Sequence, residues 1–172
     1  MTDYPQVEVR TSHGGYGVFA LEPVSLGTRI LEFVGPRVGR REVERALAAG
    51  EGDGFLQIDV DEFYALSGGA DDFVNHSCAP NTHIECEAGL VYLVASCDIT
   101  AQDELYFDYG LTQIAFPFRF NCLCGAHSCR GPIGNYDEVP LGLLNAYRAK
   151  GMVPPHVEAM MNMRGASVAR GR

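Results

Sequence analysis

The sequence predicts a mainly β protein with a few short helices. Short runs rich in β-branched and aromatic residues recur through the first 136 residues, as expected for many short strands. Glycine supplies 20 of the 172 residues and repeatedly interrupts these runs, which indicates frequent turns. Helical periodicity is confined to a segment around residue 45 and to the stretch after residue 140. Together these observations favour one small β domain with helical additions.

The expected strands are short. They lie within residues 7–34, the last of them at 28–34, and at residues 55–60 and 90–95. The run Thr28–Val34 is β-rich and partly alternating, and Gly35-Pro36 ends it. The run Leu90–Ala95 is apolar throughout, which predicts the strongest strand of the chain, buried on both faces. Turns or loops are expected at residues 51–54 and 66–70.

A short helix is predicted over residues 40–49. Val43 and Leu47 share one face at positions i and i+4, while Glu and Arg occupy most other positions. Gly50 follows and is suited to cap the C-terminal end of the helix.

Two further helices are expected near the C-terminal end. Residues 141–150 form the first, with Leu144 and Tyr147 facing inward. The second opens at Pro155, since proline suits the first helical turn, and runs through Met163. The basic tail beyond it is expected to be frayed.

Length and composition predict one soluble domain with short appendages. The chain has 172 residues and 47% apolar content, which is enough for a real core. No apolar run approaches the ~18 residues that cross a bilayer. No basic start followed by an apolar stretch marks a secretory signal, so the expected location is intracellular. That location would be cytoplasmic in a bacterium and nuclear in a eukaryote.

The net charge of −9 disfavours direct nucleic-acid binding, which needs a basic face. It suits a cationic partner, such as a peptide rich in Lys and Arg, because opposite charges steer association. The alternative is that the charge serves only solubility.

Three cysteines follow the pattern C-x-C-x4-C, a spacing that is suited to binding one metal ion. They are Cys122, Cys124 and Cys129. A closed structural zinc site needs four ligands, and Cys78 is the natural fourth. The C-terminal segment should therefore fold back onto the Asn-His-Ser-Cys segment at residues 75–78.

Other readings of the six cysteines stay open. They could form three disulfides in a secreted protein, or the cluster could carry no metal. His127 could replace one cysteine as a ligand. Cys86 and Cys97 fall outside the cluster and are expected to be buried thiols, because free cysteine is usually a core residue.

Alternating aromatics at Phe116, Phe118 and Phe120 predict an extended segment with one aromatic face. This face is either a stripe of the core or a wall of a substrate channel.

Four motifs follow one another along the chain. They are Gly-Gly-Tyr-Gly-Val-Phe-Ala at 14–20, Asn-His-Ser-Cys at 75–78, Glu-Leu-Tyr-Phe-Asp-Tyr-Gly at 104–110, and the cysteine cluster at 122–129. The glycines of the first motif would let a ligand approach the backbone closely, although such a pattern alone is often only a tight turn. In this order the four motifs resemble the SET-domain protein-lysine methyltransferases with a post-SET zinc segment. The resemblance runs from about Val7 to Gly131.

The resemblance implies the SET β-clip fold. In that fold the C-terminal segment threads under a loop as a pseudoknot and brings Asn-His-Ser-Cys beside Asp-Tyr-Gly. It also implies a SET domain over residues 1–115 and a post-SET zinc segment over 116–134. The helices predicted after residue 140 then form a C-terminal helical extension and tail over 135–172.

The resemblance further implies methyl transfer from S-adenosylmethionine to the ε-amine of a lysine in a protein, a histone or another basic substrate. Tyr109 matches the catalytic tyrosine of the family. The implied cofactor-binding residues are Gly15, Tyr16, Gly17, Asn75, His76, Tyr109 and Leu123. The implied lysine channel consists of Phe33, Tyr64, Phe107 and Phe116. One structural Zn²⁺ would be held by Cys78, Cys122, Cys124 and Cys129.

Phe107 stands where the family has Phe or Tyr, and Phe leaves room for di- or trimethylation. Two positions depart from the family. Phe33 replaces a tyrosine that commonly touches the target amine, and Asp71-Asp72 occupies a stretch that often carries Arg. Tyr64 or Tyr106 could supply the missing hydroxyl. The alternatives to an active enzyme are a catalytically weak SET-like module that binds peptide or cofactor, and a small zinc-stabilised interaction protein.

Overall fold

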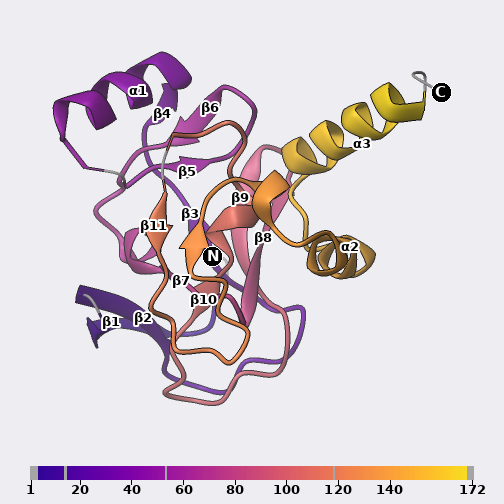
Figure 1. Cartoon of the computed structure of the whole chain (residues 1–172). Helices are drawn as coiled ribbons and strands as arrows, with labels where there is room; N and C mark the ends of the chain where they lie inside the picture. The colour runs from indigo at the N-terminus through magenta and orange to yellow at the C-terminus, as the bar shows by residue number, and fades with distance from the viewer. Residues whose placement is uncertain (1–3, 14, 53, 118, 170–172) are drawn as a thin grey trace.

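The computed structural model describes residues 4–13, 15–52, 54–117 and 119–169. Within these residues the strands form five small sheets of two or three strands each, and the helices lie at the periphery (Figure 1). The fold is therefore mainly β with short helices, as the sequence predicts. No helix in this part of the chain has the length and apolar character needed to cross a bilayer.

The largest core lies against a three-stranded antiparallel sheet in the order β3-β9-β8. The strands are β3 (Arg29–Phe33), β8 (Thr82–Glu87) and β9 (Leu90–Ala95). In the central strand β9 every residue after Leu90 is buried, which confirms the prediction from its unbroken apolar run. Phe33, at the end of β3, belongs to this core and also lines the pocket described below.

An antiparallel hairpin of β1 (Val7–Ser12) and β2 (Gly15–Ala20) adjoins the core from below in Figure 1. It is held to a distant segment by backbone hydrogen bonds, in which the Leu105 N–H donates to the Val18 carbonyl at 2.7 Å. The hairpin thus lies next to the segment that leads into Asp-Tyr-Gly.

A second three-stranded sheet combines β4 (Arg37–Gly39), β6 (Glu62–Tyr64) and β5 (Leu56–Gln57). The helix α1 (Arg40–Ala49) continues from β4 and buries Val43, and Gly50 caps it at a φ of 71°. Both the helix and its cap match the prediction.

The motifs meet at a two-residue parallel pairing of β7 (Asn75–His76) with β10 (Tyr106–Phe107). Short 3₁₀ helices flank it, η1 (Ala70–Phe73) before β7 and η2 (Tyr109–Leu111) after β10. The expected juxtaposition of Asn-His-Ser-Cys with Asp-Tyr-Gly is confirmed by this pairing.

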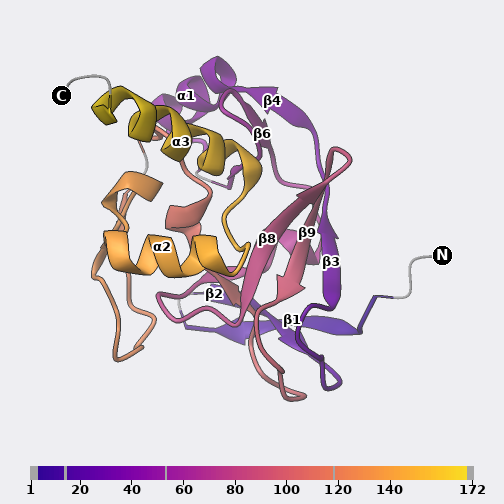
Figure 2. The same cartoon turned by 90° about the vertical axis from the view of Figure 1, so that its right-hand side faces the viewer.

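The residues after 119 pack against the segments that hold Asn-His-Ser-Cys and Asp-Tyr-Gly. The short strands β11 (Phe120–Asn121) and β12 (Pro132–Ile133) pair, and η3 (Tyr136–Glu138), α2 (Leu141–Ala149) and α3 (Pro155–Ala169) follow. Figure 2 shows α2 and α3 side by side on one flank. Leu144 and Tyr147 of α2 and Val157 of α3 form a second core with Leu111 and Ile114. The helices therefore pack directly behind the Asp-Tyr-Gly segment.

Three expectations need correction. The strand expected at 55–60 is limited to Leu56–Gln57, because Asp59 and Val60 turn the chain into β6. The last helix continues through Ala169 instead of ending at Met163 with a frayed tail. Cys97 is exposed rather than buried, since it lies in a bend just after β9. Phe118, the middle residue of the expected aromatic stripe, lies outside the described residues.

The backbone at Gly35 generates a stability prediction. Gly35 has a φ of 139°, and a Cβ there would overlap the carbonyl oxygen of Ala65. We expect Gly35→Ala to lower the free energy of unfolding by roughly 1–3 kcal/mol, because both the dihedral and the overlap oppose it.

The matched control is Gly142→Ala in α2, where an added Cβ meets open space. This change should be neutral or stabilising by up to about 0.5 kcal/mol, because alanine favours the helix. Urea denaturation followed by circular dichroism measures both, and an equal midpoint for the two variants would contradict the argument.

Candidate functional site

A pocket that is open to solvent lies between the two three-stranded sheets and the Asp-Tyr-Gly segment. Its lining is mainly aromatic and aliphatic, with Asp71 and Asp72 as the charged members. Three of the four predicted channel residues, Phe33, Tyr64 and Phe107, line it together with Tyr109. Residues that are far apart in the sequence, such as Phe33 and Tyr109, thus line one pocket.

Aromatic rings form the inner wall of this pocket. Phe33 meets Phe107 edge-on, with ring centroids 5.9 Å apart, and Phe107 lies 4.7 Å from the Tyr109 ring. The fourth predicted channel residue, Phe116, is not brought there, because its ring packs on Phe63 at 5.4 Å in a separate core cluster. The described lining therefore combines apolar rings with two tyrosines, Tyr64 and Tyr109.

Tyr109 is held at both ends. Its hydroxyl donates to the carbonyl oxygen of Val74 at 2.8 Å, and its backbone N–H donates to His76 Nδ1 at 3.2 Å. A phenol has one donor hydrogen, so with that hydrogen directed at Val74 the oxygen can act toward a ligand only as an acceptor.

His76 is buried and neutral. Burial lowers the pKa of its imidazole to about 4. Because Nδ1 accepts the Tyr109 N–H, the ring carries its hydrogen on Nε2, which lies 3.3 Å from the sulfur of Cys78. His76 therefore links the tyrosine to the cysteine cluster and is not placed for proton transfer near neutral pH.

The glycine motif borders a polar network around Glu104. A Cβ on Gly17 would overlap the Glu104 carboxylate, so glycine at this position makes room for that side chain. Asn75 Nδ2 donates to Glu104 Oε1 at 2.9 Å and to the carbonyl of Tyr16 at 2.8 Å. With both amide hydrogens engaged, Asn75 can offer a ligand only its Oδ1 acceptor.

Two more hydroxyls complete this network. Ser12 Oγ and the Tyr106 hydroxyl donate to Glu104 Oε2 at 2.5 and 2.6 Å. Burial and the neighbouring carboxylate raise the pKa of Tyr106 well above its usual range. The Tyr106 hydroxyl is therefore engaged by Glu104 and does not line the pocket. Of the two tyrosines expected to supply the missing hydroxyl, only Tyr64 lines it.

Two predicted cofactor-binding residues expose large apolar surfaces. Tyr16 is 60% exposed, with its ring edge-on to Phe73 at 5.8 Å, and Leu123 is 89% exposed. Surface of this kind is common at ligand-binding sites. Both lie outside the lining of the aromatic pocket.

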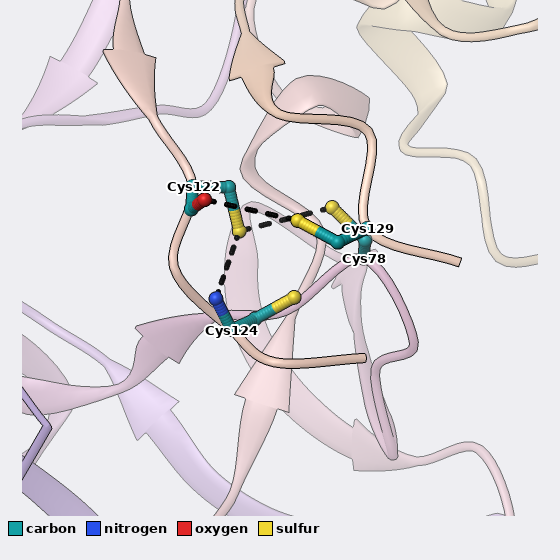
Figure 3. A group of neighbouring side chains, drawn as sticks. All are labelled: Cys78, Cys122, Cys124 and Cys129. Carbon is teal, nitrogen blue, oxygen red and sulfur yellow. Dashed lines mark hydrogen bonds between the residues drawn. The ribbon is translucent and has the colours of Figure 1, made fainter. Parts of the chain in front are cut away.

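Cys78, Cys122, Cys124 and Cys129 converge on one point (Figure 3). Their four sulfur atoms lie within 4.8 Å of one another, and those of Cys78 and Cys122 are 3.8 Å apart. Tetrahedral zinc with bonds of about 2.3 Å places its sulfurs about 3.8 Å apart, so the cluster fits this ion. His127, Cys86 and Cys97 do not belong to the group.

The surroundings of the cluster favour a bound dication. Burial raises the pKa values of the Cys78 and Cys122 thiols, so a cation is needed to keep these sulfurs ionised. Backbone N–H groups of Cys124 and Arg130 donate to the sulfurs of Cys122 and Cys78, both at 3.3 Å. Such bonds orient metal ligands. Four sulfur ligands leave no open position for water, so zinc here would be structural.

Sequence reasoning missed several residues that organise the site. They are Ser12, Glu104, Asp108 and Arg130. Glu104 and Asp108 lie inside the motif Glu-Leu-Tyr-Phe-Asp-Tyr-Gly, and Arg130 directly follows the last cysteine. A charged residue inside an otherwise apolar motif is the signal that could have identified Asp108, since such a residue needs a buried partner.

The cluster generates a prediction about metal content. We expect the purified chain to hold one zinc, and Cys124→Ser to lose it, because a serine hydroxyl is a much poorer zinc ligand than a thiolate. Elemental analysis of the dialysed proteins measures the ratio. Cys97→Ser, at an exposed position outside the group, is the control and should keep the ion. Full zinc content in Cys124→Ser would refute this ligand set.

Comparison with known proteins supports the assignment of the fold. Residues 15–110 match the family model of the SET domain. The chain is 33% identical over 136 residues to a histone-lysine N-methyltransferase, H3 lysine-4 specific, of Yarrowia lipolytica, covering 71% of this chain and 11% of that protein. It is also 33% identical over 136 residues to the probable histone-lysine N-methyltransferase set-23 of Caenorhabditis elegans, covering 67% and 54%. The chain thus spans about a tenth and about half of these two relatives.

A solved structure supports the same assignment. The crystal structure of KRYPTONITE in complex with mCHH DNA, an H3(1–15) peptide and SAH superimposes with a TM-score of 0.61 at 24% identity. The match covers 76% of this chain and 30% of that one, and it shows a shared fold. With the family match over more than half of the chain, these findings establish that the chain belongs to the SET-domain family.

Proposed function

We propose that this chain is a protein-lysine methyltransferase that uses S-adenosylmethionine. The observation that carries the proposal is Tyr109 on the inner wall of the aromatic pocket, with its hydroxyl oriented by Val74 and its backbone fixed by His76. A pocket with aromatic walls and an oriented phenol suits a long aliphatic side chain with a polar tip.

The pocket favours the reactive form of lysine. The side-chain amine must be neutral to attack a methyl group, and burial against Phe33 and Phe107 lowers the pKa of an ammonium by desolvation. The rings also keep water from the reacting nitrogen. The lysine can therefore lose its proton to solvent as it enters, and no conventional general base is required.

S-adenosylmethionine, when bound, supplies an electrophilic methyl group on a sulfonium. The residues that we expect to hold it are Asn75, which presents its Oδ1, and Tyr16 and Leu123, which expose apolar surface. The methyl transfer joins the lysine nitrogen to the methyl carbon as the carbon–sulfur bond breaks. The oxygen of Tyr109 is a fixed acceptor that aligns the amine, so the rate gain comes from orientation and a preorganised polar group.

We further propose a basic protein segment as substrate and a histone as its first candidate. The net charge of −9 favours a cationic partner, and the charged residues of the pocket lining, Asp71 and Asp72, are acidic. The names of the relatives from Yarrowia and Caenorhabditis support a histone, and a nuclear location follows if the source is a eukaryote.

A binding module without turnover is the second candidate. Phe33 favours it, since this ring packs on Phe107 and places no hydroxyl beside the target amine. Cofactor binding without methyl transfer to any protein in a cell extract would support this candidate.

The first test is Tyr109→Phe. We expect turnover to fall by about 10²-fold or more, because the change removes one preorganised polar contact. The affinity for S-adenosylmethionine should change little. Methyl transfer from labelled cofactor to histones and to a whole-cell extract measures turnover, and calorimetry measures affinity.

Tyr136→Phe is the matched control for this test. Its hydroxyl is buried without a hydrogen-bond partner among the described residues, and it lies outside the pocket. Turnover of this variant should equal that of the unaltered protein. If Tyr109→Phe is equally active, Tyr109 does not have the proposed role.

The second test is Phe107→Tyr, which concerns the degree of methylation. Phe107 lines the pocket beside Tyr109, so an added hydroxyl would occupy space there and bind water. We expect the unaltered chain to produce di- or trimethyllysine and Phe107→Tyr to stop at monomethyllysine. Mass spectrometry of the product peptide distinguishes these states. A solely monomethylated product from the unaltered chain with a good substrate would contradict the prediction.

A further inference from the structure

A buried ion pair joins two segments that lie 22 residues apart. Arg130 Nη1 donates to Asp108 Oδ2 at 2.6 Å, and Nη2 donates to Oδ1 at 2.7 Å, so the two planar groups face each other. The Asp108 side chain is fully buried, and that of Arg130 is 12% exposed. Each charge depends on the other at this depth, because neither can recover its hydration.

Asp108 in turn fixes the backbone around Tyr109. Its Oδ1 accepts the N–H of Gly110 at 3.1 Å, which caps the short helix η2 that begins at Tyr109. The same oxygen lies 3.6 Å from His76 Nδ1, the atom that accepts the Tyr109 N–H. The Asp108 carboxylate therefore fixes the backbone directly after Tyr109, through the N–H of Gly110.

Arg130 belongs to the metal loop, which we define as residues 122–131. The N–H of Arg130 donates to the sulfur of Cys78, and the N–H of Cys122 donates to the Gly131 carbonyl at 2.8 Å to close the loop. The guanidinium is thus delivered to Asp108 from a backbone that is ordered by the cysteine cluster.

A second connection runs in parallel. His76 reaches from the sulfur of Cys78 to the N–H of Tyr109, at 3.3 and 3.2 Å. Both connections begin at the cysteine cluster; the first ends at the N–H of Gly110 and the second at the N–H of the neighbouring Tyr109.

We propose that Arg130 is a positioning residue for Tyr109, acting through Asp108, so that an ordered metal loop is a condition for alignment of the tyrosine hydroxyl. This inference rests on the proposed function, in which Tyr109 aligns the target amine. It assigns the metal loop a role in the rate of the chemical step, in addition to its role in holding the C-terminal segment.

The test uses Arg130→Met, Arg130→Lys and the control Arg119→Met in the zinc-loaded full chain. Arg119 also pairs with a carboxylate, that of Glu138 at 2.6 Å, but its side chain is 62% exposed. We expect kcat to fall by about 10²-fold in Arg130→Met and about 10-fold in Arg130→Lys, which keeps the charge but loses the two-bond geometry. Zinc content and the affinity for S-adenosylmethionine should stay within about twofold in all three variants.

A second readout does not depend on turnover. In protein labelled with ¹³C-tyrosine, the Tyr109 resonance is the one that Tyr109→Phe removes. We expect Arg130→Met and Arg130→Lys to shift or broaden this resonance, and Arg119→Met to leave it unchanged. If the unaltered chain binds cofactor but transfers no methyl group, the proposed function fails, and this resonance still decides the positioning role.

Either of two results would overturn the inference. An unchanged Tyr109 resonance with kcat within about twofold of normal would show that the ion pair does not position the tyrosine. Loss of zinc and of folded structure in parallel with activity, in both Arg130 variants, would show that the pair is only structural. Arg130→Lys keeps a cation beside Asp108, so this variant still tests the positioning role if Arg130→Met does not fold.

Discussion

The candidate site is organised around the parallel pairing of β7 with β10. Only two residues of each strand pair, which is too few to be stable alone. Polar side chains replace the missing sheet neighbours, because Asn81 accepts the Tyr106 N–H at 2.9 Å and Thr82 donates to the Tyr106 carbonyl at 2.7 Å. From this pairing the chain delivers Tyr109 to the aromatic pocket on one side and Cys78 to the metal cluster on the other.

Much of the fold could be predicted from local sequence. The apolar run of β9 and the apolar face of α1 that holds Val43 depend on neighbouring residues, so patterning identifies them. The four cysteines could be grouped because metal coordination restricts ligand type and number. The pairing of β7 with β10 was available only through the family resemblance, since a two-residue strand carries no periodic signal.

The remaining errors and omissions have physical causes. Phe116 shares its residue type with the pocket rings, but its partner Phe63 draws it into a different core cluster. Cys97 follows an apolar strand yet turns outward at the bend, and no local pattern specifies that turn. Glu104 and Asp108 were missed because their partners, among them Ser12 and Arg130, are remote in sequence. Long-range polar pairing is set by tertiary structure, so single-sequence patterns do not reveal it.

The separation of Cys78 from Cys122 also has a consequence for folding. These two residues are 44 positions apart, so joining them through one ion closes a long loop of chain. By the loop-closure relation used for disulfides, a link of that length reduces the entropy of the unfolded chain by the equivalent of about 4 kcal/mol. Metal binding would therefore hold the C-terminal segment against the β core, and metal supply would control how much of the chain reaches its native state.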